Sequence, residues 1–347
     1  MPTDDGRLGV LLVSFSSVGG QAHQTAMYVP VLSTHPVLLL IGVADEADAP
    51  ASQHALNRQM ADALELPYIP DLDAALADPR VDLVSVCCPF DRRVSVLERV
   101  AAAGKHALVD KPLALRLDEC DAIERAFATH GVACVPAHHY RFDPAIRSAR
   151  AAVAGGSVGL PWAVQAEFIL AEGTAAWPLG ELLNFGLYVV DAMRSILGLD
   201  VESVYATTGS FFYGGGGSPD DFSVLALNFQ HGVVATTSVG RAPTTGHPNG
   251  YGGDRRVRVM GSHGTLVVDA AQPSLGVYGA GWAERRGYGE HSVGLLIDHL
   301  VGCIRSGQTP EVGPRDARAA LQVILAARLA AAEQRVVALD ESTLEAT

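Results

Sequence analysis

Short apolar stretches alternate with helical stretches over the first 135 residues, and this alternation limits the fold more than any other feature of the chain. Apolar runs bounded by turn residues are typical of strands buried on both faces, and the helices between them supply the crossovers of a parallel sheet. In chain order we expect strands at 8–13, 37–44, 68–69, 83–88, 107–109 and 132–135, with helices at 21–32, 51–64, 72–77, 95–103 and 117–130. The sequence therefore predicts an α/β domain built from βαβ units.

The pattern changes near His138. We expect strands at 162–170, 201–212, 222–229, 233–239, 255–260 and 265–268, and helices at 144–154, 180–198, 294–306 and 314–333. Several strands in succession favour a mixed or antiparallel sheet whose face is covered by helices on one side only. A chain of 347 residues is also too long for most single cores. We predict an α/β domain over residues 1–137 and an α+β domain with an open-faced sheet over residues 138–347.

Charge and composition exclude several classes of partner. The net charge is −13 without a cluster of Lys and Arg, which argues against nucleic acid and against an anionic membrane surface. No apolar run reaches the roughly 18–20 residues of a membrane span, and no charged segment followed by an apolar stretch opens the chain, so we expect a cytoplasmic protein. The five cysteines have no framework spacing and are expected to be reduced and buried, with Cys87 and Cys88 on opposite faces of one strand.

The run GKHALVDKPLAL places Lys111 directly after a short apolar strand. Open α/β sheets bind ligands beyond the carboxyl ends of their strands, so an ammonium group at this point is well placed to meet a ligand. Pro112 fixes the backbone after the lysine and restricts Lys111 to extended conformations. Taken alone, the tripeptide Asp110-Lys111-Pro112 also fits a surface lysine before a turn.

The turn after the first strand reads SFSSVGGQAH, where a dinucleotide-binding fold usually carries GxGxxG. One frame places Ser14, Ser16 and Gly19 at the three glycine positions, and the next frame places Phe15, Ser17 and Gly20 there. Serine is small, and its hydroxyl can donate to a phosphate. The amides of the helix that follows add further donors. This turn is expected to bind the pyrophosphate of a dinucleotide.

Two further strand ends carry candidate cofactor residues. Asp45 ends the second strand, at about the place of the acidic residue that accepts hydrogen bonds from a ribose diol. A carboxylate there repels a 2′-phosphate, so NAD is favoured over NADP. In isolation Asp45 also fits a solvated carboxylate or a helix N-cap. Cys88 and Pro89 end the fourth strand and are expected to face the nicotinamide.

The segment GELLNFGLYVVDAMRSILG carries a second group of polar residues. Asn184, Tyr188 and Asp191 are spaced i, i+4 and i+7, so they share one face of a helix that is otherwise apolar. One interpretation is a structural hydrogen-bond network. The other is a tyrosine proton donor with an amide that orients the substrate, in which the Lys111 ammonium lowers the pKa of the tyrosine.

A histidine pair opens the second domain. His138 and His139 are expected to diverge on an extended strand at the domain junction. No Cys or carboxylate stands at ligand spacing from them, so we predict no metal site.

Five segments together resemble the glucose-fructose oxidoreductase / inositol dehydrogenase (Gfo/Idh/MocA) family over almost the whole chain. In order they are AAAGKHALVDKPLAL, HHYRFDPAIRSAR, GELLNFGLYVVDAMRSILG, VRVMGSHGTLVVD and RSGQTPEVGPRDARAALQVILAA. The first resembles the family's EKP signature, with Asp110 in place of glutamate. The family's helix usually carries Asp, His and Asp where this chain has Asn184, Tyr188 and Asp191. Tyrosine at the histidine position occurs in glucose-fructose oxidoreductase and dihydrodiol dehydrogenase relatives.

The resemblance implies a Rossmann-type first domain and an NAD-dependent oxidoreductase that acts on a sugar, a cyclitol or a related ring. Lys111 stands at the family's catalytic lysine, and either Lys111 or Tyr188 is the direct proton carrier. His139, Tyr140, Arg141, Asn184 and Asp191 are candidates for holding substrate hydroxyls. A homodimer or homotetramer formed through the exposed sheet face is also implied. A non-catalytic binding or regulatory protein on the same fold is the alternative.

Overall fold

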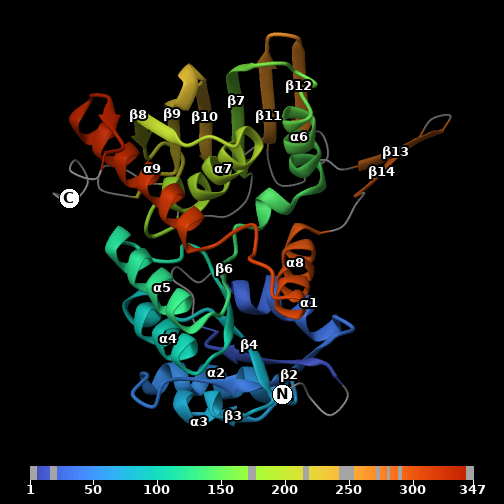
Figure 1. The fold of residues 1–347 in the computed structure, drawn as a ribbon, viewed down its shortest axis with the longest axis vertical. Helices are drawn as coiled ribbons and strands as arrows, with labels where there is room; N and C mark the ends of the chain where they lie inside the picture. Colours follow the sequence, from blue (N-terminus) through green and yellow to red (C-terminus); the bar gives the residue numbers. More distant parts are fainter. Residues whose placement is uncertain are drawn as a thin grey trace. The chain divides into compact units, whose positions relative to one another are not determined.

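The computed structural model describes residues 6–15, 22–170, 177–213, 219–241, 254–270, 274–279, 282–287 and 291–340 (Figure 1). Contacts divide the chain into two compact units. The first comprises residues 1–137 and 296–318, and the second comprises residues 138–295 and 319–347. The boundary between the two units at residue 138 lies where the sequence pattern changes. The segment 296–318, which the sequence assigned to the second domain, instead packs with the first.

The first unit is built on a six-stranded parallel sheet in the order β3-β2-β1-β4-β5-β6. The strands are β1 (Leu8–Val13), β2 (Leu38–Ala44), β3 (Tyr68–Ile69), β4 (Val81–Val86), β5 (His106–Val109) and β6 (Cys134–Pro136). The central strand β1 is buried along its whole length, which is why its sequence is a continuous apolar run. Strand order reverses between β1 and β4, the topological switch point at which open α/β sheets bind ligands. The predicted parallel sheet is confirmed.

Helices connect these strands close to the expected positions. They are a π-helical turn η2 (Gln24–Tyr28), α1 (Val29–Thr34), α2 (Ala51–Ala63), α3 (Leu72–Leu76), α4 (Phe90–Ala102) and α5 (Leu117–His130). Gly131 ends α5 in the left-handed region, at φ 65°. The expected place of the cysteine pair was wrong, because β4 ends at Val86 and both residues follow the strand. Cys87 and Cys88 are nevertheless buried, free thiols.

The returning segment 296–318 is joined to the first unit by side-chain contacts. His35 Nε2 lies 2.8 Å from Asp298 Oδ1, and Arg318 donates to Asp121 of α5 at 2.7 Å. The segment also lines one side of an open pocket of about 360 Å³ beside α5 and β6. These contacts join residues almost 200 or more positions apart in the chain, so no local pattern reports them.

The second unit contains a seven-stranded sheet in the order β12-β11-β7-β10-β9-β8-β15 (Figure 1). Its strands are β7 (Pro161–Leu170), β8 (Val201–Gly209), β9 (Phe222–Phe229), β10 (Val234–Arg241), β11 (Asp254–Gly261), β12 (Gly264–Asp269) and β15 (Val337–Ala338). Only the β7–β10 pair is parallel, and the other pairs are antiparallel. Strand β9 alternates buried and exposed side chains, as expected for a sheet with one covered face. The predicted mixed sheet is confirmed.

Helix α7 (Glu181–Leu197) packs on the inner face of this sheet, against β7, β9 and β10. Helix α6 (Pro144–Ala154) also belongs to this unit, whereas α8 (Ser292–Ser306) and α9 (Pro314–Glu333) each contain residues of both units. Two features were not expected. A separate hairpin joins β13 (Ser274–Gly279) to β14 (Trp282–Gly287), and η3 (His139–Phe142) is a 3₁₀ turn where the sequence predicted an extended strand for the histidine pair. In the described part of the chain, no helix has the length and apolar character needed to cross a membrane.

Candidate active site

Four predicted cofactor residues follow neighbouring strands of the first sheet. Ser14, Asp45, Cys88 and Lys111 come just after β1, β2, β4 and β5, respectively. The strands are parallel, so their carboxyl ends meet at one edge of the sheet. Four other predicted cofactor residues, Ser16, Ser17, Gly19 and Gly20, lie outside the described residues.

Ser14 adopts a backbone conformation that usually selects glycine. Its φ is 63°, in the left-handed region, and its side chain is fully buried. Its amide donates to the Ala44 carbonyl of β2 at 3.2 Å, and the next amide, that of Phe15, donates to Asn57 Oδ1 at 2.8 Å. The chain therefore turns sharply after β1, as a glycine turn does, although no glycine stands at this position.

Asp45 is the centre of a buried hydrogen-bond network. It is 1% exposed, and its carboxylate accepts from Gln53 Nε2 at 2.8 Å, from Asn57 Nδ2 at 2.5 Å and from the Tyr68 hydroxyl at 3.0 Å. Burial, followed by the adjacent Asp45 carboxylate, raises the pKa of Tyr68. Gln53 and Asn57 were not among the predicted residues. Two amides four positions apart on one helix face were the signal that sequence reasoning did not use.

Lys111 is almost completely buried, with 3% of its surface exposed. The preceding carboxylate, that of Asp110, accepts from the Tyr28 hydroxyl at 2.7 Å and lies 2.9 Å from His23 Nδ1. Burial by itself raises the pKa of Asp110, but His23, then Arg93 and Lys111, reverse this and hold the pKa below its usual value. Lys111 is thus preceded by a fixed negative charge.

Arg93 was missed by the sequence analysis, and it clamps the backbone around Lys111. Its guanidinium donates to the carbonyls of Asp110 at 3.0 Å and Cys88 at 2.6 Å, and also to the carbonyl of Pro112. These contacts tie the backbone on both sides of the lysine to the turn that follows β4. The sequence signal was an arginine near the start of α4, four residues after Pro89, the residue that precedes that helix.

The predicted polar face of α7 is entirely buried. Asn184 and Asp191 are 0% exposed and Tyr188 is 5% exposed. The helix begins after Gly180, whose φ is 86° and where a Cβ would lie 2.0 Å from Asp220 Oδ1. Only glycine lets the Asp220 carboxylate approach closely enough to accept from the Leu182 amide at 2.7 Å. The position of the polar face thus depends on a tight turn at its start.

Tyr188 and His139, both predicted substrate residues, contact each other. Their ring centroids are 4.9 Å apart in an edge-to-face arrangement, and Phe168 stacks with Tyr188 at a centroid distance of 5.8 Å. His139 Nδ1 lies 2.8 Å from the Ser292 hydroxyl. The phenol ring is therefore held between an imidazole and a phenyl ring, which fixes its orientation.

Arg141 and Asp191 pair with each other. Arg141 Nε donates to Asp191 at 2.8 Å, with a second bond from the same guanidinium, and His138 Nδ1 lies 3.2 Å away without good hydrogen-bond alignment. Burial by itself raises the pKa of Asp191, but Arg141 and then His138 bring the pKa well below its usual value. Tyr140 packs edge-on against Phe168, and its buried hydroxyl has no partner among the described residues.

Asn184 donates from Nδ2 to Glu181 at 2.8 Å, and Glu181 also accepts from Arg241 at 2.7 Å. Neither Glu181 nor Arg241 was predicted. Glu181 stands one turn before Asn184, a spacing readable from the sequence, whereas Arg241 comes from β10, sixty positions away.

The first unit has a ligand-binding edge at the switch point of a parallel sheet, and the second has a buried polar helix face on an open sheet. This combination is typical of oxidoreductases in which a dinucleotide-binding domain is followed by an α+β domain. Residues 17–138 match the model of the oxidoreductase family with an NAD-binding Rossmann fold, and residues 146–267 match that of the GFO/IDH/MocA C-terminal domain. The chain belongs to the Gfo/Idh/MocA oxidoreductase family.

Relatives and solved structures agree with this assignment. A myo-inositol 2-dehydrogenase of Thermotoga maritima is 27% identical over 77% of this chain and 82% of its own length. A scyllo-inositol 2-dehydrogenase (NAD(+)) of Bacillus subtilis is 26% identical over 86% of this chain and 87% of its own. The crystal structure of GenD2 from gentamicin A biosynthesis, in complex with NAD, has a TM-score of 0.79 at 23% identity, covering 96% of this chain and 97% of that one.

Proposed function

We propose that this protein is an NAD(H)-dependent oxidoreductase that interconverts a hydroxyl and a ketone on a cyclitol, a sugar or a related ring. The observation that carries the proposal is Lys111. Lys111 is almost completely buried and follows β5 at the carboxyl edge of the parallel sheet, where open α/β sheets bind ligands, and Arg93 fixes the backbone on both sides of it. The inositol dehydrogenases among the relatives support the substrate class.

In this proposal the nicotinamide, when bound, takes or gives the hydride. Tyr188 removes or supplies the hydroxyl proton, and the Lys111 ammonium favours the phenolate by its charge. Lys111 as the direct proton carrier is the alternative within the same site. Asn184 and His139 hold substrate hydroxyls. The remaining candidates act indirectly, by fixing η3 against α7; they are Arg141, Asp191 and Tyr140. The charged groups of Arg141 and Asp191 already pair with each other.

The residues at the end of β2 fit NAD better than NADP. Asp45, Glu46 and Asp48 place three carboxylates there, and a 2′-phosphate would be repelled by them. Arg92, which lies 3.3 Å from Glu46 and 3.0 Å from Asp48, offsets part of this charge. Fluorescence titration is expected to show tighter binding of NADH than of NADPH, and equal affinities would show that these carboxylates face away from the ribose.

The direct test is turnover. Purified protein is incubated with NAD⁺ and a panel of myo-inositol, scyllo-inositol and aldoses, and NADH formation is followed by absorbance. Lys111→Ala is expected to lower turnover by about 10²–10⁴. Lys105 is the matched control, because it is the only other lysine of the chain and its ammonium donates to the carbonyls of Val81 and Asp78. Retained NADH binding without turnover on any substrate would favour the binding-protein alternative.

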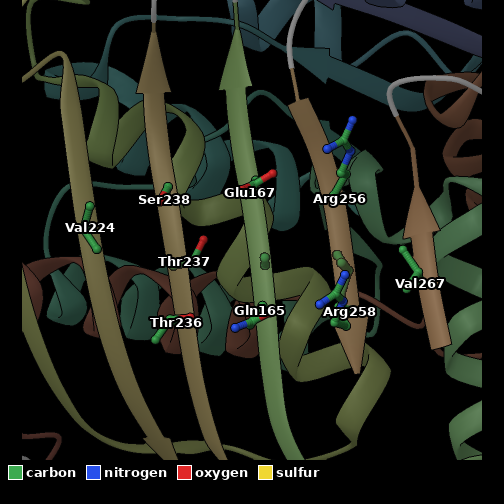
Figure 2. A pocket seen from close by; sticks show the side chains of 11 residues that line it. Gln165, Glu167, Val224, Thr236, Thr237, Ser238, Arg256, Arg258 and Val267 are labelled. Carbon is green, nitrogen blue, oxygen red and sulfur yellow. The ribbon is translucent and has the colours of Figure 1, made fainter. Parts of the chain in front are cut away.

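We propose further that the exposed face of the second sheet joins copies of this chain into a homodimer or homotetramer. Several large apolar side chains on its strands are exposed, namely Trp162 (60%), Tyr205 (41%), Val224 (46%), Val234 (50%) and Val267 (61%). Figure 2 shows the side chains that line a shallow hollow on β7, β9, β10, β11 and β12. The hollow has a volume of about 390 Å³. There Glu167 and Arg258 form no ion pair with any described residue, so each has charge to offer a partner.

Light scattering coupled to size-exclusion chromatography tests whether the chain forms this homodimer or homotetramer. The wild-type chain is expected to run as a dimer or tetramer. Val224→Asp should shift it toward the monomer, because the change places an unpaired charge within the proposed interface. Leu56→Asp, at a similarly exposed apolar position on α2 (40% exposed), is the control. A wild-type monomer at micromolar concentration would contradict the proposal.

A further inference from the structure

Asn57, on α2, is a fully buried amide that joins the carboxyl ends of β1 and β2. Its Oδ1 accepts from the Phe15 amide at 2.8 Å, and its Nδ2 donates to Asp45 Oδ2 at 2.5 Å. The side chain is 0% exposed. Asn57 stands 42 positions from Phe15 and 12 from Asp45, so one side chain links the turn after β1 to the carboxylate after β2.

The two partners of Asn57 fix the direction of its amide. A side-chain amide has a donor end and an acceptor end of nearly the same shape, and its partners decide between the two orientations. The Phe15 amide can only donate, and a carboxylate at Asp45 can only accept. This pair of bonds therefore requires an amide at position 57, because leucine offers neither end and aspartate offers only acceptors.

The bond to Phe15 holds a backbone conformation that is unfavourable for serine. Ser14, directly before Phe15, has a φ of 63°, and the left-handed region is costly for residues other than glycine. This cost and the gain from one buried hydrogen bond are of the same order. Asn57 can therefore offset the strain that arises because Ser14 stands where a dinucleotide-binding turn usually has glycine.

We infer that Asn57 is a positioning residue that compensates for the missing glycine, by holding the turn after β1 in shape and locking it to Asp45. The part of this inference that concerns the cofactor rests on the proposed function. In dinucleotide sites of this kind, the turn after the first strand meets the pyrophosphate and the carboxylate after the second meets the ribose. Asn57 sets these two groups relative to each other before NAD binds, and this pre-organisation strengthens binding.

Two leucine variants separate the turn from the carboxylate. Asn57→Leu removes both hydrogen bonds at nearly constant volume. Gln53→Leu is the matched control, because Gln53 lies one turn earlier on α2 and donates to the same Asp45 at 2.8 Å, whereas the Phe15 amide donates to Asn57. NADH binding, followed by fluorescence, is expected to weaken about tenfold in Asn57→Leu and about threefold in Gln53→Leu, since only the first variant also releases the turn.

Glycine at position 14 should rescue Asn57→Leu specifically. Ser14→Gly removes the steric cost of the left-handed backbone, so the turn keeps its shape without the bond to Asn57. Asn57→Leu with Ser14→Gly is expected to bind NADH to within about threefold of Ser14→Gly alone. Ser14→Ala removes the same hydroxyl but keeps the Cβ, so it should give no rescue. Neither change at position 14 should rescue Gln53→Leu.

Hydrogen exchange without nucleotide gives a readout that does not depend on the cofactor. At a temperature where circular dichroism shows every variant folded, the Phe15 amide, followed by NMR, should exchange about tenfold faster in Asn57→Leu than in wild type. In Gln53→Leu it should exchange at the wild-type rate. Asn57→Asp keeps an acceptor for Phe15, so it should retain slow exchange and weaken NADH binding without rescue by Ser14→Gly. This variant carries the test if Asn57→Leu does not fold.

The outcomes separate this inference from the proposed function. Absent NADH binding by the wild-type chain overturns the proposed function, while the expected exchange rates would still show that Asn57 holds the turn. A lower Tm in Asn57→Leu with unchanged NADH affinity makes Asn57 a packing residue and overturns the inference. Rescue by Ser14→Ala as strong as by Ser14→Gly, or equal exchange of Phe15 in the two leucine variants, overturns it as well.

Discussion

Removal of the Arg93 guanidinium is expected to be among the most damaging single changes in the first unit. In Arg93→Met, the buried carbonyls of Cys88, Asp110 and Pro112 lose their donor together. A net loss of about 1–1.5 kcal/mol for each hydrogen bond gives about 3–5 kcal/mol in the free energy of unfolding. Methionine keeps the contact with the Phe90 ring, over which the guanidinium lies at 4.4 Å, so packing changes little.

Urea unfolding followed by circular dichroism measures this loss. With an m-value of about 3 kcal/mol/M, the midpoint of Arg93→Met should fall by about 1–1.7 M. Arg93→Lys keeps the charge without the planar fork and should fall by about half as much. Arg92→Met is the matched control, because its partly exposed ion pairs with Glu46 and Asp48 should contribute less than about 1 kcal/mol. Equal midpoints for Arg93→Met and Arg92→Met would refute the clamp.

Three further predictions concern the reaction, the cofactor turn and pH. Tyr188→Phe should lower turnover about as strongly as Lys111→Ala, and the loss in the double variant should be less than the product of the single losses if the two residues act as the proposed acid–base pair. Full activity of the phenylalanine variant across pH would leave Lys111 as the only proton carrier. Replacing Ser16 and Ser17 with glycine should tighten NADH binding if the side chains crowd the pyrophosphate, and weaker binding would mean that their hydroxyls donate to it. Because the folded-state pKa of Asp191 is lowered by its arginine and histidine partners, its contribution to stability is complete above about pH 4 and declines as pH falls further. Acid unfolding monitored by circular dichroism should therefore be less pH-dependent below pH 4 in Asp191→Asn, and an unchanged slope would contradict the lowered pKa.

The sequence predicted the elements that are governed by local patterns. The strands of the first sheet are buried on both faces, so their apolar runs stand out, and turn residues mark their ends. The spacing of Asn184, Tyr188 and Asp191 correctly placed them on one helix face, because helical geometry fixes that relation. The 3₁₀ turn at His139 was missed because it is accompanied by an ion pair between Arg141 and Asp191. These residues stand fifty positions apart, so no local pattern indicates that they pair.

The candidate site was predictable only in part, because some of its contacts join residues that are distant in the sequence. Lys111 could be found because its position after a strand is local. Arg93 and Glu181 were missed because their importance comes from carbonyls and side chains brought to them by folding. Asp45 illustrates both cases: its place at the end of β2 was readable, whereas its burial by Gln53, Asn57 and Tyr68 was not.

The return of residues 296–318 to the first unit has a consequence for dissecting this protein. The chain passes between the two units within α8, after residue 295, and again within α9, after residue 318. A fragment that stops at residue 137 therefore lacks one side of the open pocket beside α5 and the partners of His35 and Asp121. Neither unit is an autonomous piece of contiguous sequence, and a nucleotide-binding fragment would need residues 296–318 grafted back by a linker.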